Sequence, residues 1–399
     1  MRANLKTVVY VSALAVVGAA ITAAPAWGLQ RLPQRPVCPG PASLGSARCG
    51  AHVITNERGT PKATTSPAGY GPAQFHTAYA LPPTGSTAQT IAIVDAYDDP
   101  TIASDLNHYD SYYGLPACTS TGANPCFRKV NQNGAAGPYP NKNAGWALEI
   151  ALDVETAHQI CQSCQILLVE ASSNSFANLE TAVRTAARLG ATEISNSYGG
   201  SEFSGETSDT AYDQPGIAVT ASSGDGGYGA EFPASSPSVV AVGGTTLRLN
   251  SNGTYASESV WNGAGSGCSS YLDARSWQTS LSNWSLTGCG SRRGVADVAA
   301  DADPNTGASV YDTTKYQGRS GWFQVGGTSL SAPLIAGVYG LAGNAASASY
   351  PASIPYGSQS NLHDVTQGSN GNCGTIMCAG TSGYDGPTGV GTPNTAAGF

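Results

Sequence analysis

Charged side chains are scarce in this sequence of 399 residues, and none of them gather into a basic block. Only 11% of the residues are charged whereas 41% are hydrophobic, which excludes a disordered chain and a coiled coil. The formal net charge of -8 and the lack of clustered Lys and Arg argue against a nucleic-acid partner, because neutralising phosphates requires such clusters.

Long apolar runs are also missing, except near the N-terminus. There Arg2 and Lys6 precede an apolar run over residues 8–24, and small residues follow at 24–26. This layout predicts a secretory signal peptide over residues 1–26 and therefore a secreted, extracellular protein. The alternative is an uncleaved membrane anchor, because the run is near the lower spanning length. After signal cleavage we expect no membrane contact and a monomer.

Cysteine is present in an even number, which in an exported chain favours disulfide bonds over thiol chemistry. One neighbouring pair, Cys161 and Cys164, could also form a redox pair or half of a zinc site, but no second CxxC motif accompanies it. Spacing alone does not fix connectivity, yet every cysteine has a near neighbour. We predict five sequence-local bridges: Cys38–Cys49, Cys118–Cys126, Cys161–Cys164, Cys268–Cys289 and Cys373–Cys378.

The order of apolar segments predicts the fold class. Residues 27–69 are rich in Pro, Gly, Ser and Thr and are predicted to form a short leader or a surface-wrapping arm. From residue 70 to 399, strands alternate with helices, which predicts an α/β fold with a mostly parallel central sheet and helices on both faces. We expect strands at 90–97, 164–171, 193–199, 217–222 and 239–242, and helices from 101 and at 144–160, 176–189 and 328–341.

In parallel sheets, ligands bind beyond the carboxyl ends of the strands. Three groups of residues are candidates for such a site. The first is GGTSLSAP at 326–333, a glycine turn that runs into a helix. The hydroxyl of Ser329 would lie at the helix N-terminus, whose dipole and free N–H groups favour developing negative charge. The alternative is that Thr328 or Ser329 only caps the helix.

The second group is a pair of carboxylates, Glu149 and Asp153, on one face of a predicted helix. No Lys or Arg occurs between residues 143 and 183, so no local cation relieves their repulsion. Carboxylates paired in an apolar setting share protons, and one gains a raised pKa suited to general-base catalysis. The alternative is a solvated polar stripe.

The third group is SSGDGG at 222–227, directly after an apolar strand. The common meaning of such a string is an Asp-Gly turn. The functional alternative is that Asp225 donates a hydrogen bond to an oxyanion, which requires a protonated carboxyl group.

Together these motifs make the chain resemble the sedolisins, the serine-carboxyl peptidases, over roughly residues 70–399. Members of this family look like subtilisins in fold but use Glu and Asp where subtilisin uses His. GGTSLSAP is similar to the nucleophile motif, the ExxxD pair stands in the helix that would carry the subtilisin histidine, and no HGTH-type motif is present. SNSYGGSE at 195–202 and RGVADVAADADPNTG at 293–307 also match.

The resemblance implies a subtilisin-like three-layer fold and a secreted peptidase that acts at acidic pH on polypeptides, as an endopeptidase or a tripeptidyl-peptidase. Ser329 is then the nucleophile, Glu149 the general base and Asp153 the residue that orients Glu149. Protonated Asp225 and the backbone N–H of Ser329 stabilise the oxyanion. The edge expected to pair with substrate backbone comprises Ser197, Tyr198 and Gly199.

The resemblance also implies a stabilising Ca²⁺ near the C-terminus. The expected ligands are the carboxylates of Asp364 and Asp385 and the carbonyl oxygens of Val365, Thr381 and Gly383. The family usually has glycine at the position of Thr381, a change that a carbonyl ligand tolerates. The alternative is a glycine-rich turn with incidental aspartates.

A second acidic string, Asp301-Ala-Asp303, resembles a calcium loop only superficially, because Thr306 stands where an EF-hand needs glycine. We therefore interpret Asp297, Asp301 and Asp303 as structural residues near the site.

Two alternatives to an active sedolisin stay open. One is a subtilisin-like peptidase that uses Asp95, at the end of the first strand, with a distant histidine; none of the five histidines lies in a glycine-flanked helix start. The other is a catalytically inactive secreted binding protein on the same scaffold. The chain departs from the family in having only the short segment 27–69 where sedolisins carry a long prosegment.

Overall fold

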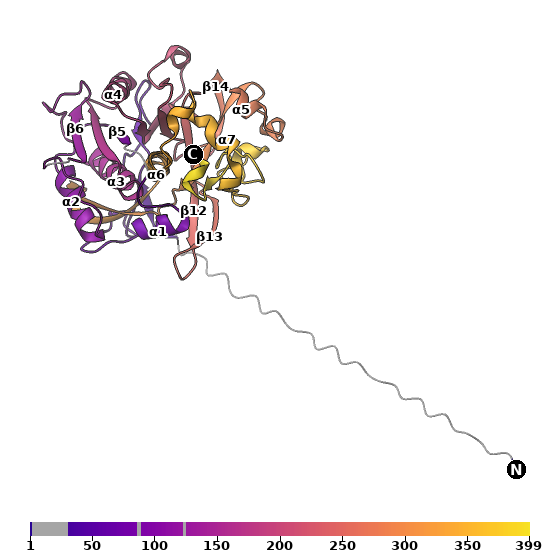
Figure 1. The fold of residues 1–399 in the computed structure, drawn as a ribbon, viewed down its shortest axis with the longest axis horizontal. Helices are drawn as coiled ribbons and strands as arrows, with labels where there is room; N and C mark the ends of the chain where they lie inside the picture. The colour runs from indigo at the N-terminus through magenta and orange to yellow at the C-terminus, as the bar shows by residue number, and fades with distance from the viewer. Residues whose placement is uncertain (2–30, 86–88, 123–124) are drawn as a thin grey trace. The chain divides into compact units, whose positions relative to one another are not determined.

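A mostly parallel sheet of eight strands forms the centre of the fold (Figure 1). Seven strands follow in the order β13-β12-β10-β8-β5-β7-β6, and β16 pairs with β12. Only the β12–β13 pair is antiparallel. The strands are β5 Thr90–Ala96, β6 Phe127–Asn131, β7 Gln165–Ala171, β8 Glu193–Asn196, β10 Ala218–Ser222, β12 Val240–Leu249, β13 Tyr255–Val260 and β16 Val298–Asp301.

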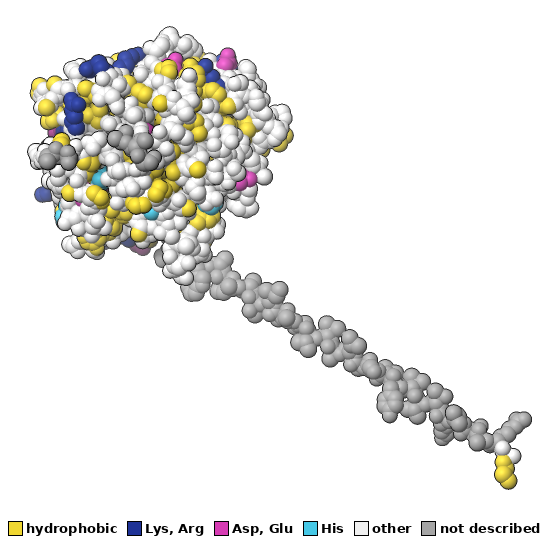
Figure 2. Space-filling model, in the orientation of Figure 1, with side chains coloured by type: hydrophobic (Ala, Val, Ile, Leu, Met, Phe, Trp, Pro, Cys, Tyr) yellow, Lys and Arg dark blue, Asp and Glu magenta, His cyan; other side chains and the backbone are white. Residues whose placement is uncertain are grey.

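The computed structural model describes residues 1, 31–85, 89–122 and 125–399. The predicted signal peptide falls on residues outside these ranges. One unit comprises Leu32–Phe399, and residues 1–31 form the other. Within the described residues, no helix combines the length and the apolar character that a membrane span requires. The face drawn in Figure 2 carries few charged side chains, in keeping with their 11% share of the sequence.

Helices cover the sheet on both faces, as the alternating pattern predicts. Helices α3 (Ala144–Ile160) and α6 (Thr328–Ala342) pack against each other and against the central strands. Both are buried on nearly all sides: α6 is mostly apolar, whereas α3 also buries charged side chains such as Glu149 and Asp153. Helix α4 (Phe176–Arg188) packs against β5 and β7, and in Figure 1 it lies above the strands while α3 lies below them.

The N-terminal segment is built into two further sheets. We call residues 32–64 the arm. Its strands β1 (Gln34–Pro36), β3 (His52–Ile54) and β4 (Ala63–Thr64) belong to a sheet with β17 (Ala308–Tyr316) and β18 (Arg319–Gly326). Its strand β2 (Arg48–Cys49) instead pairs with β9 (Tyr198–Ser201), which also pairs with β11 (Glu231–Phe232).

Two predicted strands differ from those in the structure. The strand expected at 193–199 is interrupted, because β8 stays in the central sheet whereas β9 turns away to pair with the arm. The strand expected at 239–242 continues to Leu249 as β12, because β13 pairs with its second half. The partner of β9 comes from a distant part of the chain, whereas β13 follows β12 after a short turn.

All ten cysteines form the five predicted disulfide bonds. The prediction of local pairs is therefore confirmed, and no cysteine is left for a redox or zinc site.

The other helices and strands are α1 Pro72–Ala78, α2 Ile102–Tyr113, α5 Ser276–Thr279, α7 Ile354–Gly357, β14 Gly267–Asp273, β15 Arg292–Val295, β19 Leu362–His363 and β20 Thr392–Pro393.

Candidate active site

Ser329 lies in the first turn of α6, at the centre of the candidate site. Gly327 precedes the helix with φ of 105°, and a Cβ there would lie 2.0 Å from the carbonyl oxygen of Gly50, so the turn requires glycine. The Oγ of buried Ser329 donates to the carbonyl oxygen of Ser197 at 3.2 Å. The cap interpretation of Thr328 or Ser329 is wrong, because Gly327 is the N-cap residue and no side chain caps the helix.

Helix α3 brings Glu149 to this serine. Its N-terminus is fixed by Asn143, whose side chain accepts from the backbone N–H groups of Gly145 and Trp146. Burial and the neighbouring Asp153 raise the pKa of Glu149 well above its usual value, and the adjacent Ser329 hydroxyl opposes this shift. Glu149 and Asp153 are both fully buried, so they do not form a solvated stripe.

A third carboxyl group continues the pair. Asp95 is the second-last residue of β5 and is fully buried. Burial raises the pKa of Asp95 well above its usual value, and the charges of Glu149 and Glu170 add to the shift. Burial followed by the charge of Asp95 likewise raises the pKa of Asp153. Asp95 thus adjoins both members of the pair and extends the buried carboxyl network.

Asp225 approaches Ser329 from the end of β10. Its Oδ1 accepts from the backbone N–H of Thr328 at 2.8 Å and from the Thr328 hydroxyl at 2.7 Å. Its Oδ2 is buried and accepts no hydrogen bond. Burial raises the pKa of Asp225 to about 7, against the effect of the two Thr328 bonds. A proton on Oδ2 would leave Asp225 able to donate into the site.

Thr328 is a site residue whose role we did not predict beyond capping. It fixes the carboxyl plane of Asp225 through its backbone and its side chain, while its Oγ1 also accepts from the backbone N–H of Gly224 at 3.2 Å. The position of Thr328 next to Ser329 was a signal that the sequence offered. Its partner Asp225 could not be found that way, because it lies 103 residues away.

The predicted substrate-binding edge is paired in this structure with the arm. Tyr198 and Gly199 lie in β9 opposite Cys49 and Arg48, and the carbonyl oxygen of Ser197 accepts from the backbone N–H of Gly50 at 3.3 Å. The Tyr198 ring is buried, and its hydroxyl donates to Asn196 at 2.7 Å. Backbone groups of this edge therefore can pair with an extended peptide.

All five histidines lie in the described residues, and none stands between Asp95 and Ser329. His158 contacts Asp110 at 3.3 Å, and His76 contacts the carbonyl oxygens of Leu81 and Gln159. His108 stacks on Tyr311 and His363 on Tyr255. His52 lies in the arm with its Nε2 3.6 Å from Asp225 Oδ2. The subtilisin-like alternative finds no histidine in the required place.

Near the C-terminus, Asp364 and Asp385 occupy one loop region. Asp385 is buried and accepts from the backbone N–H groups of Thr381 and Thr388 at 2.9 Å each. Asp364 accepts from the backbone N–H of Gly383 at 3.1 Å. Burial, together with the charge of Asp364, raises the pKa of Asp385 to about 8. The hydroxyl of Thr381 is buried without a partner. Two close carboxylates and an unpartnered hydroxyl form an oxygen-rich donor set that fits Ca²⁺.

A second acidic cluster was not predicted from the sequence. Asp99, Asp105 and Asp312 each place an oxygen within 4.8 Å of the others, and all three are buried. Such a buried triad could bind a metal ion. The residues interpreted as structural make protein contacts instead: Asp297 pairs with Arg293, Asp301 accepts from Leu247 and Thr306, and Asp303 accepts from Thr246.

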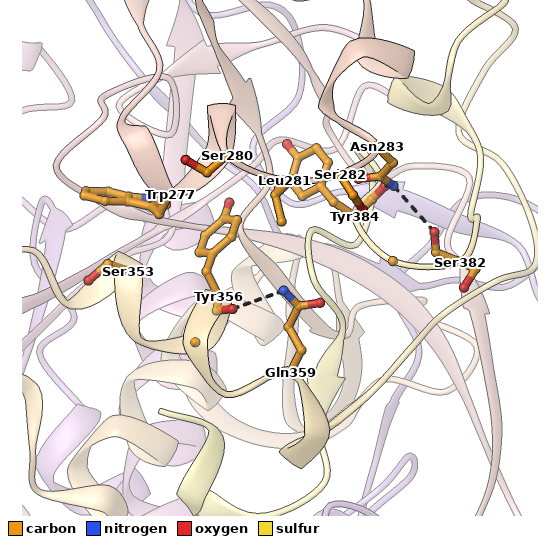
Figure 3. Close-up of a pocket in the computed structure, with 12 residues that line it drawn as sticks. Trp277, Ser280, Leu281, Ser282, Asn283, Ser353, Tyr356, Gln359, Ser382 and Tyr384 are labelled. Carbon is orange, nitrogen blue, oxygen red and sulfur yellow. Dashed lines mark hydrogen bonds between the residues drawn. The ribbon is translucent and has the colours of Figure 1, made fainter.

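A pocket of about 630 Å³ lies beside the C-terminal loop and is lined by Ser382 and Gly383 among others (Figure 3). The Tyr356 and Tyr384 side chains line it, and the amide of Asn283 donates to the carbonyl oxygen of Ser382. None of the twelve lining residues belongs to the group around Ser329. The pocket is therefore separate from the candidate catalytic residues.

The parallel sheet, with Glu149 on α3 and Ser329 on α6, defines a subtilisin-like α/β protein in which carboxyl groups surround the serine. The subtilase family matches residues 134–366, more than half of the chain, and the chain belongs to this family. The prediction of a sedolisin-like protein is confirmed by its relatives.

Two relatives match about four fifths of this chain. Sedolisin from Pseudomonas sp. (strain 101) is 29% identical over 368 aligned positions, and the match covers 81% of this chain and 60% of the relative. Kumamolisin from Bacillus sp. (strain MN-32) is 30% identical over 377 aligned positions, and the match covers 83% of this chain and 63% of the relative. The chain thus spans about three fifths of the length of these relatives.

The fold comparison agrees. A solved structure of Pseudomonas sedolisin, a serine-carboxyl proteinase complexed with two molecules of pseudo-iodotyrostatin, has a TM-score of 0.66 at 27% identity. The match covers 82% of this chain and 96% of that chain. Sphericase, at 16% identity and a TM-score of 0.50 over 83% of this chain and 99% of its own, shares the fold.

Proposed function

We propose that this protein is a serine-carboxyl peptidase that hydrolyses peptide bonds of polypeptides at acidic pH. The observation that carries the proposal is the convergence of Glu149 and Asp225 on Ser329. Among the described residues, which include all five histidines, no imidazole is placed to act as the base. Carboxyl groups must then move the protons, and they do so best in acid.

Glu149 acts as the general base in this proposal. It takes the proton of Ser329 as Oγ attacks the substrate carbonyl, and returns it to the leaving amine. Asp153, one helical turn further along α3, positions Glu149 and raises its basicity by its charge. Asp95 extends the same network.

Asp225 acts as an oxyanion donor together with the backbone N–H of Ser329. The unpartnered Oδ2 supports this role, because it is free to carry the proton while Thr328 holds Oδ1. The substrate backbone pairs with Ser197, Tyr198 and Gly199, whose main-chain groups the arm already engages.

We place the Ca²⁺ site at Asp364 and Asp385, with the carbonyl oxygens of Val365, Thr381 and Gly383. The bound ion would neutralise two carboxylates and join the loops at 364 and 381–385. Secretion follows from the predicted signal peptide, and five disulfide bonds are in keeping with an extracellular protein.

The test is hydrolysis of an acid-denatured protein, followed by mass spectrometry, across acidic and neutral buffers. We expect peptide products in acid from the wild-type chain and none from Ser329→Ala or Glu149→Gln at matched thermal stability. His158→Gln is the control and should keep full activity. A rate that still climbs at neutral pH, or activity that survives Ser329→Ala, would contradict the proposal.

A further inference from the structure

The arm shows where the residues of a peptide paired with β9 would lie. Strand β2 runs antiparallel to β9, and the next residue, Gly50, donates its N–H to the carbonyl oxygen of Ser197 at 3.3 Å. A Cβ added to Gly50 would lie 3.0 Å from Ser329 Oγ and 3.7 Å from Asp225 Oδ1. A substrate that pairs with β9 in the place of the arm therefore puts the residue before its scissile bond at the position of Gly50.

Two glycines make room for the carboxylate of Glu231 beside this position. A Cβ added to Gly199 in β9 would lie 2.5 Å from Glu231 Oε2. A Cβ added to Gly224 would lie 2.9 Å from Glu231 Cδ and 3.0 Å from Oε2. A side chain at either position would displace the carboxylate, so the two glycines keep the space in which it lies. Since Gly224 directly precedes Asp225, this space adjoins the reacting groups.

Glu231 offers a carboxylate that the protein does not use. It lies in β11, where its backbone pairs with Ser201 of β9, and its side chain is partly buried. Burial raises the pKa of Glu231, the charge of Arg48 lowers it and the charge of Asp225 raises it. Among the described residues, no hydrogen bond to the carboxylate contributes to this shift. Both oxygens of Glu231 are therefore available to a donor that a ligand brings.

The arm itself brings a cation to this side of the edge. Arg48 lies two residues before Gly50 in an extended stretch, so the two positions face the same side. Against the effect of burial, the charge of Arg48 lowers the pKa of both Glu231 and Asp225, which means that its guanidinium lies on the side of these carboxyl groups. Because residue 50 is glycine, no side chain extends from that position towards Glu231.

We propose that Glu231 selects substrates that carry Lys or Arg immediately before the scissile bond. This inference rests on the proposed peptidase function and names its substrate class. A basic side chain at the position of Gly50 passes between Gly199 and Gly224 and forms an ion pair with the Glu231 carboxylate. The positive charge favours the ionised form of Glu231. An uncharged side chain of the same shape leaves the carboxylate without a partner and is therefore bound less well.

The experiment uses the full chain in acidic buffer and peptides that differ only in the residue before the scissile bond. That residue is Lys, its uncharged analogue norleucine, Arg or its uncharged analogue citrulline, and mass spectrometry locates each cut. We expect kcat/KM of the wild-type chain to be at least about tenfold higher for each basic residue than for its analogue. Glu231→Gln keeps the shape of the side chain and should bring this ratio close to one, while cleavage of the norleucine peptide is kept.

Two further variants separate charge recognition from a general disturbance of the fold. Asp273→Asn removes an exposed carboxylate and should leave the preference for Lys over norleucine unchanged. Glu231→Lys should reverse the preference and favour Glu before the bond, since the recognising charge is then positive. All variants are compared at matched thermal stability, and if Glu231→Lys does not fold, the isosteric Glu231→Gln decides.

The outcomes distinguish this inference from the proposed function. The inference is overturned, with the peptidase function intact, if the wild-type chain cleaves the norleucine peptide as well as the Lys peptide or if the preference for Lys persists in Glu231→Gln. It is also overturned if the preference follows the third residue before the bond, because that residue takes the position of Arg48. Cleavage of no peptide by the wild-type chain would instead contradict the proposed function itself.

Discussion

At the scale of single residues, burial decides the chemistry of the carboxyl groups. In water, the carboxyl groups of Glu149, Asp153 and Asp225 would be ionised at any pH above their usual pKa values. Removed from water, each holds its proton more tightly, and the hydrogen bonds that remain decide which loses it first. Glu149 accepts from the Ala51 N–H through Oε2, and Asp225 accepts from the N–H and hydroxyl of Thr328 through Oδ1, while Asp225 Oδ2 accepts from no group.

Asp225→Asn should therefore change the pH profile more than the maximal rate. An amide donates a hydrogen bond at every pH, whereas Asp225 donates only below its pKa of about 7. We expect wild-type kcat/KM to fall tenfold per pH unit above that value, and the Asn variant to retain activity there. Asp273→Asn, on the surface, is the control. An alkaline limb that stays in place in Asp225→Asn would remove Asp225 from the oxyanion site.

At the scale of elements, the C-terminal loop brings the carboxyl groups of Asp364 and Asp385 close together. Asp385 is buried with backbone N–H donors around it, and the charge of Asp364 works against its ionisation. A cation that binds here would favour the ionised form of Asp385 and join two segments of the chain. It would stabilise the fold without taking part in the reaction at Ser329.

Calcium should therefore raise the unfolding temperature, and a chelator should lower it. A ligand that binds only the folded state stabilises it by about 2.7 kcal/mol at a hundredfold excess over Kd. Asp385→Asn should abolish the response to added Ca²⁺ in calorimetry while the rate per active site is kept. Should the response survive in Asp385→Asn but vanish in Asp312→Asn, the ion would belong to the cluster of Asp99, Asp105 and Asp312.

At the scale of the whole molecule, many buried acids make the fold itself acid-adapted. Glu193 is fully buried in β8, and burial raises its pKa to about 8. Burial raises the pKa of Asp312 to about 9. A group whose pKa is higher in the folded than in the unfolded state stabilises the fold below its unfolded pKa. That contribution is lost as the pH rises through the folded value.

The free energy of unfolding should therefore fall between acidic pH and about pH 9, where each unit of pKa difference corresponds to about 1.4 kcal/mol. Denaturant titrations across this range should give lower midpoints at higher pH. Glu193→Gln should flatten the dependence, whereas Glu57→Gln, at an exposed turn, should leave it unchanged. A midpoint that rises from acid towards neutral pH in the wild-type chain would contradict this account.

Local patterns in the sequence determined the elements, the five disulfides and the motif residues Ser329, Glu149, Asp153 and Asp225. Those features depend on periodicity and on neighbours close in the chain, which a sequence carries directly. Only the tertiary structure decided where the arm runs, how Thr328 holds Asp225 and that Asp99, Asp105 and Asp312 meet. These depend on contacts between segments that lie about a hundred or more residues apart. No local pattern specifies them, because backbone pairing is nearly indifferent to side-chain identity and burial arises only when distant elements pack.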